Sequence, residues 1–263
     1  MTKEWARAAL SHPAFTGISR AHLGGLIEEL AGPWTARCES ALHERRGGNR
    51  RQRPGAGPKH DLVFTDRVLV TLVHLRHQLP HAALAELYGL ERSTITRAIG
   101  EIRPLLAARG FAVPDRPGLR LHTLADVFAY AAAEGITLRI DGTETQVRLH
   151  PDVRAEVDDG YRGLANEFPD QISTPPKNLE DVALTERYGW REMRRRQSSR
   201  RICVEHANAE HKQWRPLQRF LGRREHYSAT HRAIAGLVSD RAAQRATHRK
   251  PSTALVPVTP TIR

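Results

Sequence analysis

Apolar positions that recur every three to four residues predict helices in the first part of the chain. In residues 16–34 such a stripe follows Ser19, which is a good N-cap, and Gly32-Pro33 is expected to end the helix. Residues 65–80 are apolar nearly all round, which predicts a buried helix with Thr65 as its cap, Asp66 in its first turn and Pro80 just beyond its end.

Two further helix patterns, separated by a short turn, occupy residues 80–106. Leu84, Leu87 and Leu90 would face inward, Gly89 would close the first helix, and Ser93 or Thr94 would cap the second. The second helix would bury Ile95, Ile99 and Ile102. Its polar outer face would consist of Arg92, Ser93, Thr94, Thr96 and Arg97. This punctuation is typical of a helix-turn-helix that reads the major groove, although an ordinary helical hairpin has the same pattern.

Farther along the chain the apolar period changes from that of a helix to that of a strand. Residues 136–140 alternate as in a half-buried strand and lead to Asp141, and a second short apolar strand ends at Val157, directly before Asp158. Taken alone, each acid is equally typical of a turn. A helix that begins near residue 198 would place Glu205, Asn208 and Lys212 on one face.

The net charge of +12 favours a polyanionic partner, with nucleic acid first. The longest apolar runs are far shorter than a membrane-spanning helix requires, and the first residues lack the apolar core of a signal peptide. Two cysteines are too few for a disulfide framework or a thiolate zinc site, which fits a reducing, cytoplasmic environment.

Basic residues are concentrated where the composition changes. Residues 43–60 should form a flexible cationic linker, either a solvated tether or an arm that lies along phosphates. Residues 187–201 carry seven arginines and one glutamate. The tail from Arg241 onward is expected to be disordered.

The motifs "RIDGTETQV", "VDDGYRGL" and "RICVEHANAEHKQW", in this order after a helix-turn-helix, resemble bacterial insertion-sequence transposases with a DDE site on an RNase H-like core. The resemblance implies that Asp141, Asp158 and Glu205 are the catalytic acids and hold two Mg²⁺ or Mn²⁺ ions. It implies DNA-facing roles for Lys212 and Trp214. The implied partner is double-stranded DNA, at element ends and target, and a homo-oligomer on DNA is compatible with this role.

The spacing of the first two acids departs from that family. Sixteen residues separate Asp141 from Asp158. Two further strands and a helix, which the family places there, require roughly 40 residues or more. We therefore infer an internal deletion near Arg148-Leu149 that impairs DNA cleavage and strand transfer. The alternative is a non-catalytic DNA-binding remnant that inhibits transposition. RNA binding is disfavoured because aromatic residues make up only 6% of the chain.

The expected fold class is α+β, with a helical helix-turn-helix domain followed by a truncated RNase H-like α/β catalytic domain. The expected segments are an N-terminal helical segment (1–42), the basic linker (43–60), the helix-turn-helix domain (61–115), the DDE domain lacking a segment near 148–149 (122–243) and the tail (244–263).

Overall fold

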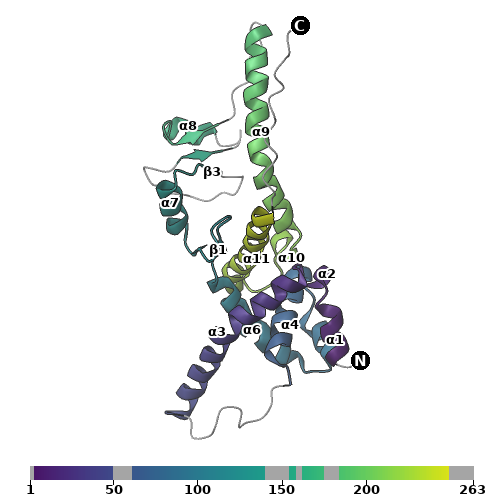
Figure 1. The fold of residues 1–263 in the computed structure, drawn as a ribbon. Coiled ribbons are helices and arrows are strands. Elements are labelled where there is room, and N and C mark those ends of the chain that lie inside the picture. Colours follow the sequence, from purple (N-terminus) through teal and green to yellow (C-terminus); the bar gives the residue numbers. More distant parts are fainter. Residues whose placement is uncertain (1–2, 50–60, 140–153, 158–161, 175–183, 249–263) are drawn as a thin grey trace, which may run out of the picture.

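The computed structural model describes residues 3–49, 61–139, 154–157, 162–174 and 184–248, and most of these are helical (Figure 1). The helices are α1 (Lys3–Leu10), α2 (Pro13–Thr16), α3 (Arg20–Arg46), α4 (Phe64–His77), α5 (His81–Tyr88), α6 (Arg92–Ala108), α7 (Leu124–Ala133), α8 (Arg162–Glu167), α9 (Leu184–Lys212), α10 (Arg215–Gln218) and α11 (Tyr227–His248), with a 3-10 turn at Arg224–His226. None of them is long and apolar enough to cross a membrane.

The strands of the described residues are short. Strands β1 (Phe111–Ala112) and β2 (Arg120–Leu121) form an antiparallel pair. Strands β3 (Leu138–Arg139), β4 (Ala155–Glu156) and β5 (Ile172–Ser173) form a parallel sheet in that order. The structure is thus mostly helical with few strands, and it does not by itself establish an RNase H-like domain.

Helix α3 begins where the sequence predicts but ends much later. The Ser19 side chain accepts a hydrogen bond of 3.1 Å from the backbone N–H of His22 and caps the helix. The predicted end at Gly32-Pro33 is wrong, because the helix continues to Arg46. Trp34, just beyond the proline, stacks on Phe64 at 5.0 Å, and this packing favours a continuous helix despite the proline. The first part of the expected linker is therefore helical.

Helix α4 lies between two apolar cores, which explains why nearly every position in it is apolar. Val68, Leu69 and Leu72 belong to a core shared with α3, α6 and α11, whereas Val70 and Val73 belong to a core shared with α1, α5 and α6. The prediction of a buried helix is confirmed.

The start of α4 differs in detail from the prediction. The helix begins at Phe64, so Thr65 lies inside its first turn and is not the cap. Asp66 is in the first turn, as expected, but its carboxylate is buried and accepts hydrogen bonds from Arg7 Nε and Nη2 at 2.7 and 2.8 Å. This ion pair joins α1 to α4.

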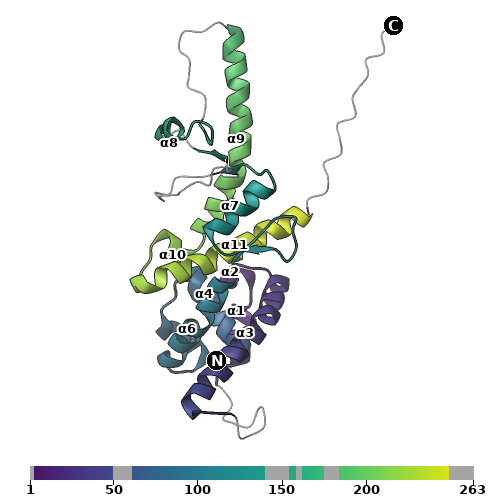
Figure 2. The same cartoon turned by 90° about the vertical axis from the view of Figure 1, so that its left-hand side faces the viewer.

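Helix α11 returns the C-terminal part of the chain to the N-terminal helices (Figure 2). Ile234, Leu237 and Val238 are buried in the core shared with α3, α4 and α6. Each such side chain contributes about 1.5–3 kcal/mol of burial free energy. The expectation of disorder from Arg241 onward is wrong as far as His248, where the described helix ends. Residues 227–243, which we expected in the catalytic domain, thus share a core with the helix-turn-helix.

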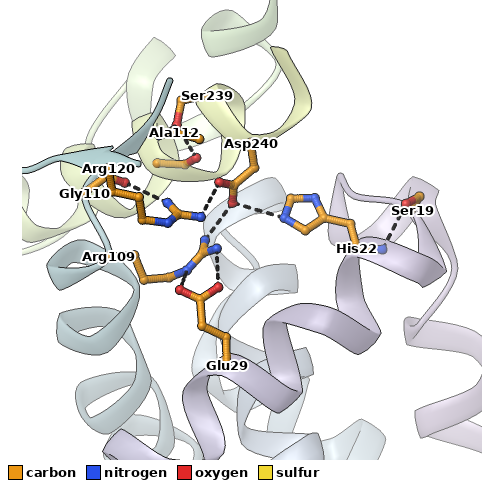
Figure 3. A network of polar contacts seen from close by, with 10 residues as sticks. Ser19, His22, Glu29, Arg109, Gly110, Ala112, Arg120, Ser239 and Asp240 are labelled. Carbon is orange, nitrogen blue, oxygen red and sulfur yellow. Dashed lines mark hydrogen bonds and ion pairs between the residues drawn. The ribbon is translucent and has the colours of Figure 1, made fainter. Parts of the chain in front are cut away.

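A buried carboxylate joins α11 to the elements beneath it (Figure 3). Asp240 Oδ2 accepts hydrogen bonds from Arg109 Nη1 at 2.7 Å and from His22 Nε2 at 3.1 Å, and Oδ1 accepts one from Arg120 Nη2 at 2.6 Å. Arg109 also donates to both carboxylate oxygens of Glu29, at 2.8 and 2.6 Å. One ion-pair network therefore connects four segments of the chain: α3, the end of α6, β2 and α11.

Burial alone would raise the pKa of Asp240. The hydrogen bond from His22 and the positive charges of Arg109 and Arg120 outweigh burial and lower the pKa from the ordinary value of 3.8 to about 2. The folded state therefore favours the ionised form. The ionised Asp240 carboxylate therefore stabilises the folded state by an amount that is essentially complete above pH 4 and is lost as the pH falls toward 2. The lowered pKa corresponds to about 2 kcal/mol of stability.

We predict that Asp240→Asn lowers the free energy of unfolding at pH 7 by about 3 kcal/mol, because it leaves the charge of Arg109 only partly compensated in a buried site. Denaturant unfolding followed by circular dichroism measures this change. The same series between pH 4 and pH 2 should show a smaller loss of stability in the variant than in the natural chain.

Asp170→Asn is the matched control, because Asp170 is exposed and lies outside the network. It should change the free energy of unfolding by less than about 0.5 kcal/mol. Equal stabilities for the two variants at pH 7 would show that the network does not hold α11 in place.

Candidate nucleic-acid interface

Helices α5 and α6 are joined by the turn that the sequence predicts. Gly89 has a φ of 61°, in the left-handed region, and its N–H bonds to the carbonyls of Ala85 and Glu86. Leu84 is fully buried, and Leu87 and Leu90 pack against the same core. These contacts confirm that α5, the turn and α6 form a helix-turn-helix.

The predicted cap of α6 is wrong. The helix begins at Arg92, before both expected cap residues. Its N-cap is Glu91, whose side chain makes no capping hydrogen bond. Ser93 and Thr94 consequently lie inside the first turn. This shift leaves the hydroxyl of Ser93 on the exposed surface of the helix.

The two faces of α6 differ as predicted. Ile95, Ile99 and Ile102 are buried in the cores beneath the helix. The polar face comprises exposed Arg92, Ser93, Thr96 and Arg97, with Thr94 half-buried. Two guanidinium groups and two hydroxyl groups on the first turns of one helix can bond to base edges in the major groove.

Thr96 also holds the two helices together. Its hydroxyl donates to the carbonyl of Arg92 at 3.0 Å and lies 2.8 Å from Nδ1 of His81, the first residue of α5. Burial, and then the positive charges of His74 and Arg92, lower the pKa of His81. The sequence pattern did not identify His81 as part of this interface. Its position directly after Pro80, at the start of α5, is the signal that could have identified it.

The His74 ring packs against His81. Their ring centroids lie 4.8 Å apart, and Nδ1 of His74 lies 3.0 Å from the carbonyl oxygen of Leu79. Burial lowers the pKa of His74. With both pKa values lowered, the neutral rings are favoured near pH 7, and they support α5 beneath the start of α6.

The third motif lies at the end of α9, and its members differ in exposure. Glu205 and Lys212 are exposed. Trp214 is fully buried, with its ring 5.3 Å from the Arg76 guanidinium and against Gly17. The expected DNA-facing role of Trp214 is therefore corrected to a core role. The reason is that α9 ends at Lys212, and the chain turns inward before α10.

The other two predicted acids, Asp141 and Asp158, lie outside the described residues. Glu205 is the one of the three acids that the structure describes, and its side chain is exposed. Carboxylate oxygens are hard ligands of the kind that Mg²⁺ prefers. Within the described residues alone, no cluster of three side chains could hold a metal ion.

The basic cluster of residues 187–201 lies on α9. Arg191, Arg195 and Arg196 are exposed there, and Arg196 pairs with Glu192 at 3.0 Å. The Arg194 guanidinium lies 5.1 Å from the ring centroid of Trp190. This half of α9 therefore presents a cationic surface.

The comparisons with known proteins agree with this description of the helix-turn-helix. Residues 60–112 match the family described as the helix-turn-helix of DDE superfamily endonuclease. This segment spans α4, α5 and α6 and implies a DNA-binding role of the transposase type. No curated protein and no solved structure matches the chain.

We predict that Gly89→Ala lowers the free energy of unfolding by about 1 kcal/mol, since a side chain is disfavoured at positive φ even in open space. No atom lies within 4 Å of the Cβ position at Gly89, so the effect would come from the backbone alone. Denaturant unfolding measures it.

Gly100→Ala is the matched control. Its Cβ position is equally open, but Gly100 lies inside α6 with ordinary helical geometry. This substitution should raise the free energy of unfolding by about 0.5–1 kcal/mol. The same sign for both variants would refute the special role of the turn.

Proposed function

We propose that this chain is a DDE transposase of an insertion sequence that binds the element ends through α6 and has lost most of its cleavage activity. The observation that carries the proposal is the amphipathic division of α6. Arg92, Ser93 and Arg97 are exposed on its first turns, while the opposite face is buried in two cores.

Physical chemistry supports major-groove reading by this face. An arginine can donate two parallel hydrogen bonds to O6 and N7 of guanine, and a serine or threonine hydroxyl can bond to several bases. The net charge of +12 would add sequence-independent attraction to phosphates through counterion release. Together, attraction to phosphates and contacts with bases suit a protein that first binds DNA without sequence preference and then selects a site.

The proposed catalytic acids are Asp141, Asp158 and Glu205. Strands β3 and β4 are parallel neighbours in which Leu138 pairs with Ala155 and Arg139 with Glu156, an offset of seventeen positions. Asp141 and Asp158 differ by the same seventeen positions in the sequence. This equality supports the assignment of the two acids to equivalent positions after neighbouring strands.

In this proposal Asp141, Asp158 and Glu205 would together hold two divalent ions. When bound, such ions supply charge neutralisation at the attacking and leaving oxygens of an in-line displacement. The carboxylates would fix the positions of the ions. Water would attack the phosphodiester during cleavage and release a DNA 3′-hydroxyl, and this 3′-hydroxyl would attack a target phosphodiester during strand transfer and release a target 3′-hydroxyl.

The short segment between the first two acids supports the loss of activity. Sixteen residues cannot contain two further strands and a helix of ordinary length. Among the described residues, β3 lies at one edge of the three-stranded sheet, next to β4.

The second candidate function is a non-catalytic DNA-binding protein that occupies element ends and inhibits an active transposase. The contrast between the two parts of the molecule favours it. The helix-turn-helix has two extensive cores, whereas the described sheet has a small core of Ala155, Val157 and Ile172. DNA binding would then survive without cleavage.

We predict that Arg97→Ala weakens binding to the preferred DNA site by about 5- to 150-fold, as expected for the loss of one bidentate base contact. The site is first selected with the natural chain from a library of random duplexes. Fluorescence anisotropy at a stated salt concentration then gives both dissociation constants.

Arg154→Ala is the control, because Arg154 is exposed and directly precedes β4, outside the helix-turn-helix. It removes the same charge and should weaken binding by less than about 3-fold. Similar losses for the two variants would reject α6 as the reading helix.

We predict that the purified chain binds the selected DNA but shows little or no nicking of it with Mg²⁺ or Mn²⁺. A supercoiled plasmid that carries the selected site measures nicking. Efficient cleavage or joining that Asp141→Asn and Glu205→Gln both abolish would establish an intact DDE site and reject the loss of activity.

A further inference from the structure

A pocket of about 680 Å³ lies where the N-terminal helices meet α11 and the turn after α9. Its walls include Gly17 and Ser19 between α2 and α3, Arg76 of α4, Gln213, and Arg241 and Arg245 of α11. Among the residues that the structure describes, the pocket wall contains no aspartate or glutamate.

The three arginines of this pocket are unequally compensated. Arg245 forms an ion pair with Glu210, which is buried. Arg76 and Arg241 pair with no described carboxylate and reach only neutral acceptors. Arg76 Nη2 donates to Oε1 of Gln213 at 3.1 Å, and Arg241 Nη1 donates to the carbonyl of Gly17 at 3.3 Å.

Arg76 also has an unused donor. Its Nη1 atom is buried and has no hydrogen-bond partner, and a buried guanidinium donor without an acceptor is costly. Burial, followed by the charge of Arg241, lowers the pKa of Arg76, and the carboxylate of Glu210 acts in the opposite direction. The protein thus holds Arg76 and Arg241 near each other, and the nearby buried carboxylate of Glu210 forms its ion pair with Arg245.

Two neighbouring features add to the positive potential. Ser19 is the N-cap of α3, a helix of 27 residues, so the positive end of the helix dipole lies at the pocket wall. The Arg76 guanidinium lies 5.3 Å from the centroid of the Trp214 ring, and this cation–π contact favours its observed orientation. The donors are therefore arranged before any ligand binds.

We infer that this pocket is a phosphate-binding site in which Arg76 and Arg241 hold the anion at the N-terminus of α3. A planar guanidinium group donates two parallel hydrogen bonds to phosphate oxygens, and two such groups match the charge of a phosphate dianion. The phosphate comes either from a DNA backbone or from a free phosphate compound. Only the first source rests on the proposed DNA-binding function.

The test begins with the full chain in the absence of DNA. Sodium phosphate at 20 mM should raise the melting temperature by about 2–4 °C relative to sodium chloride of equal ionic strength. Arg241→Gln should abolish this rise, and its melting temperature in chloride should be unchanged or higher because a like-charge contact has been removed. Arg232→Gln, an exposed position of α11, should retain the full rise.

The second arm measures binding of a 30-base-pair duplex of mixed sequence at several salt concentrations. A DNA source predicts that Arg241→Gln weakens binding more than Arg232→Gln, that its salt slope is smaller by about 1, and that phosphate competes with DNA. A free phosphate source predicts that the melting rise is lost in Arg241→Gln while its DNA affinity equals that of Arg232→Gln.

The proposal is overturned if phosphate and chloride give the same melting temperature for the natural chain and Arg241→Gln binds DNA as Arg232→Gln does. It is also overturned if Arg241→Gln keeps the rise produced by phosphate. A natural chain that shows the rise but does not bind DNA would reject the proposed DNA-binding function and retain the phosphate site.

Discussion

The buried carboxylate of Asp240 joins the two ends of the described chain. It accepts hydrogen bonds from Arg109 at the end of α6, Arg120 of β2 and His22 of α3, and Glu29 completes the compensation of Arg109. Desolvation of these charges is costly, so the network is stable only when all partners are in place. Helix α11 can therefore dock in one register, and the apolar side chains beside Asp240 then complete the core around α6.

This docking has consequences for both proposed ligand sites. Helix α6 is packed against α4, α5 and α11, so its buried face is fully used and its polar face remains for DNA. The same helix α11 carries Arg241, one residue after the buried carboxylate, to the pocket that contains Arg76. The position of the phosphate-binding site thus depends on the ion-pair network, whereas the reading face of α6 depends on the apolar pattern of that helix.

The helix-turn-helix and the proposed catalytic acids are supported by different observations. The helix-turn-helix is supported by the buried contacts of residues between Leu84 and Ile102 and by the family match at residues 60–112. The proposed acids are supported by the order of their motifs, by the parallel pairing of β3 with β4 and by the exposure of Glu205. A protein that binds element ends without cutting them would compete with an active transposase for the same DNA, so loss of catalysis need not mean loss of biological effect.

Local patterns in the sequence determined the buried helix α4, the turn at Gly89, the polar face of α6 and the cap at Ser19, because each depends on neighbours within a few residues. Tertiary packing decided the rest. Stacking of Trp34 on Phe64 carries α3 past Pro33, and docking on α6 orders the chain beyond Arg241. The turn after α9 buries Trp214, and contact with Thr96 gives His81 its role. These outcomes rest on residues far apart in the chain, whose burial and pairing outweigh the local preference, and such long-range contacts leave no periodic pattern in one sequence.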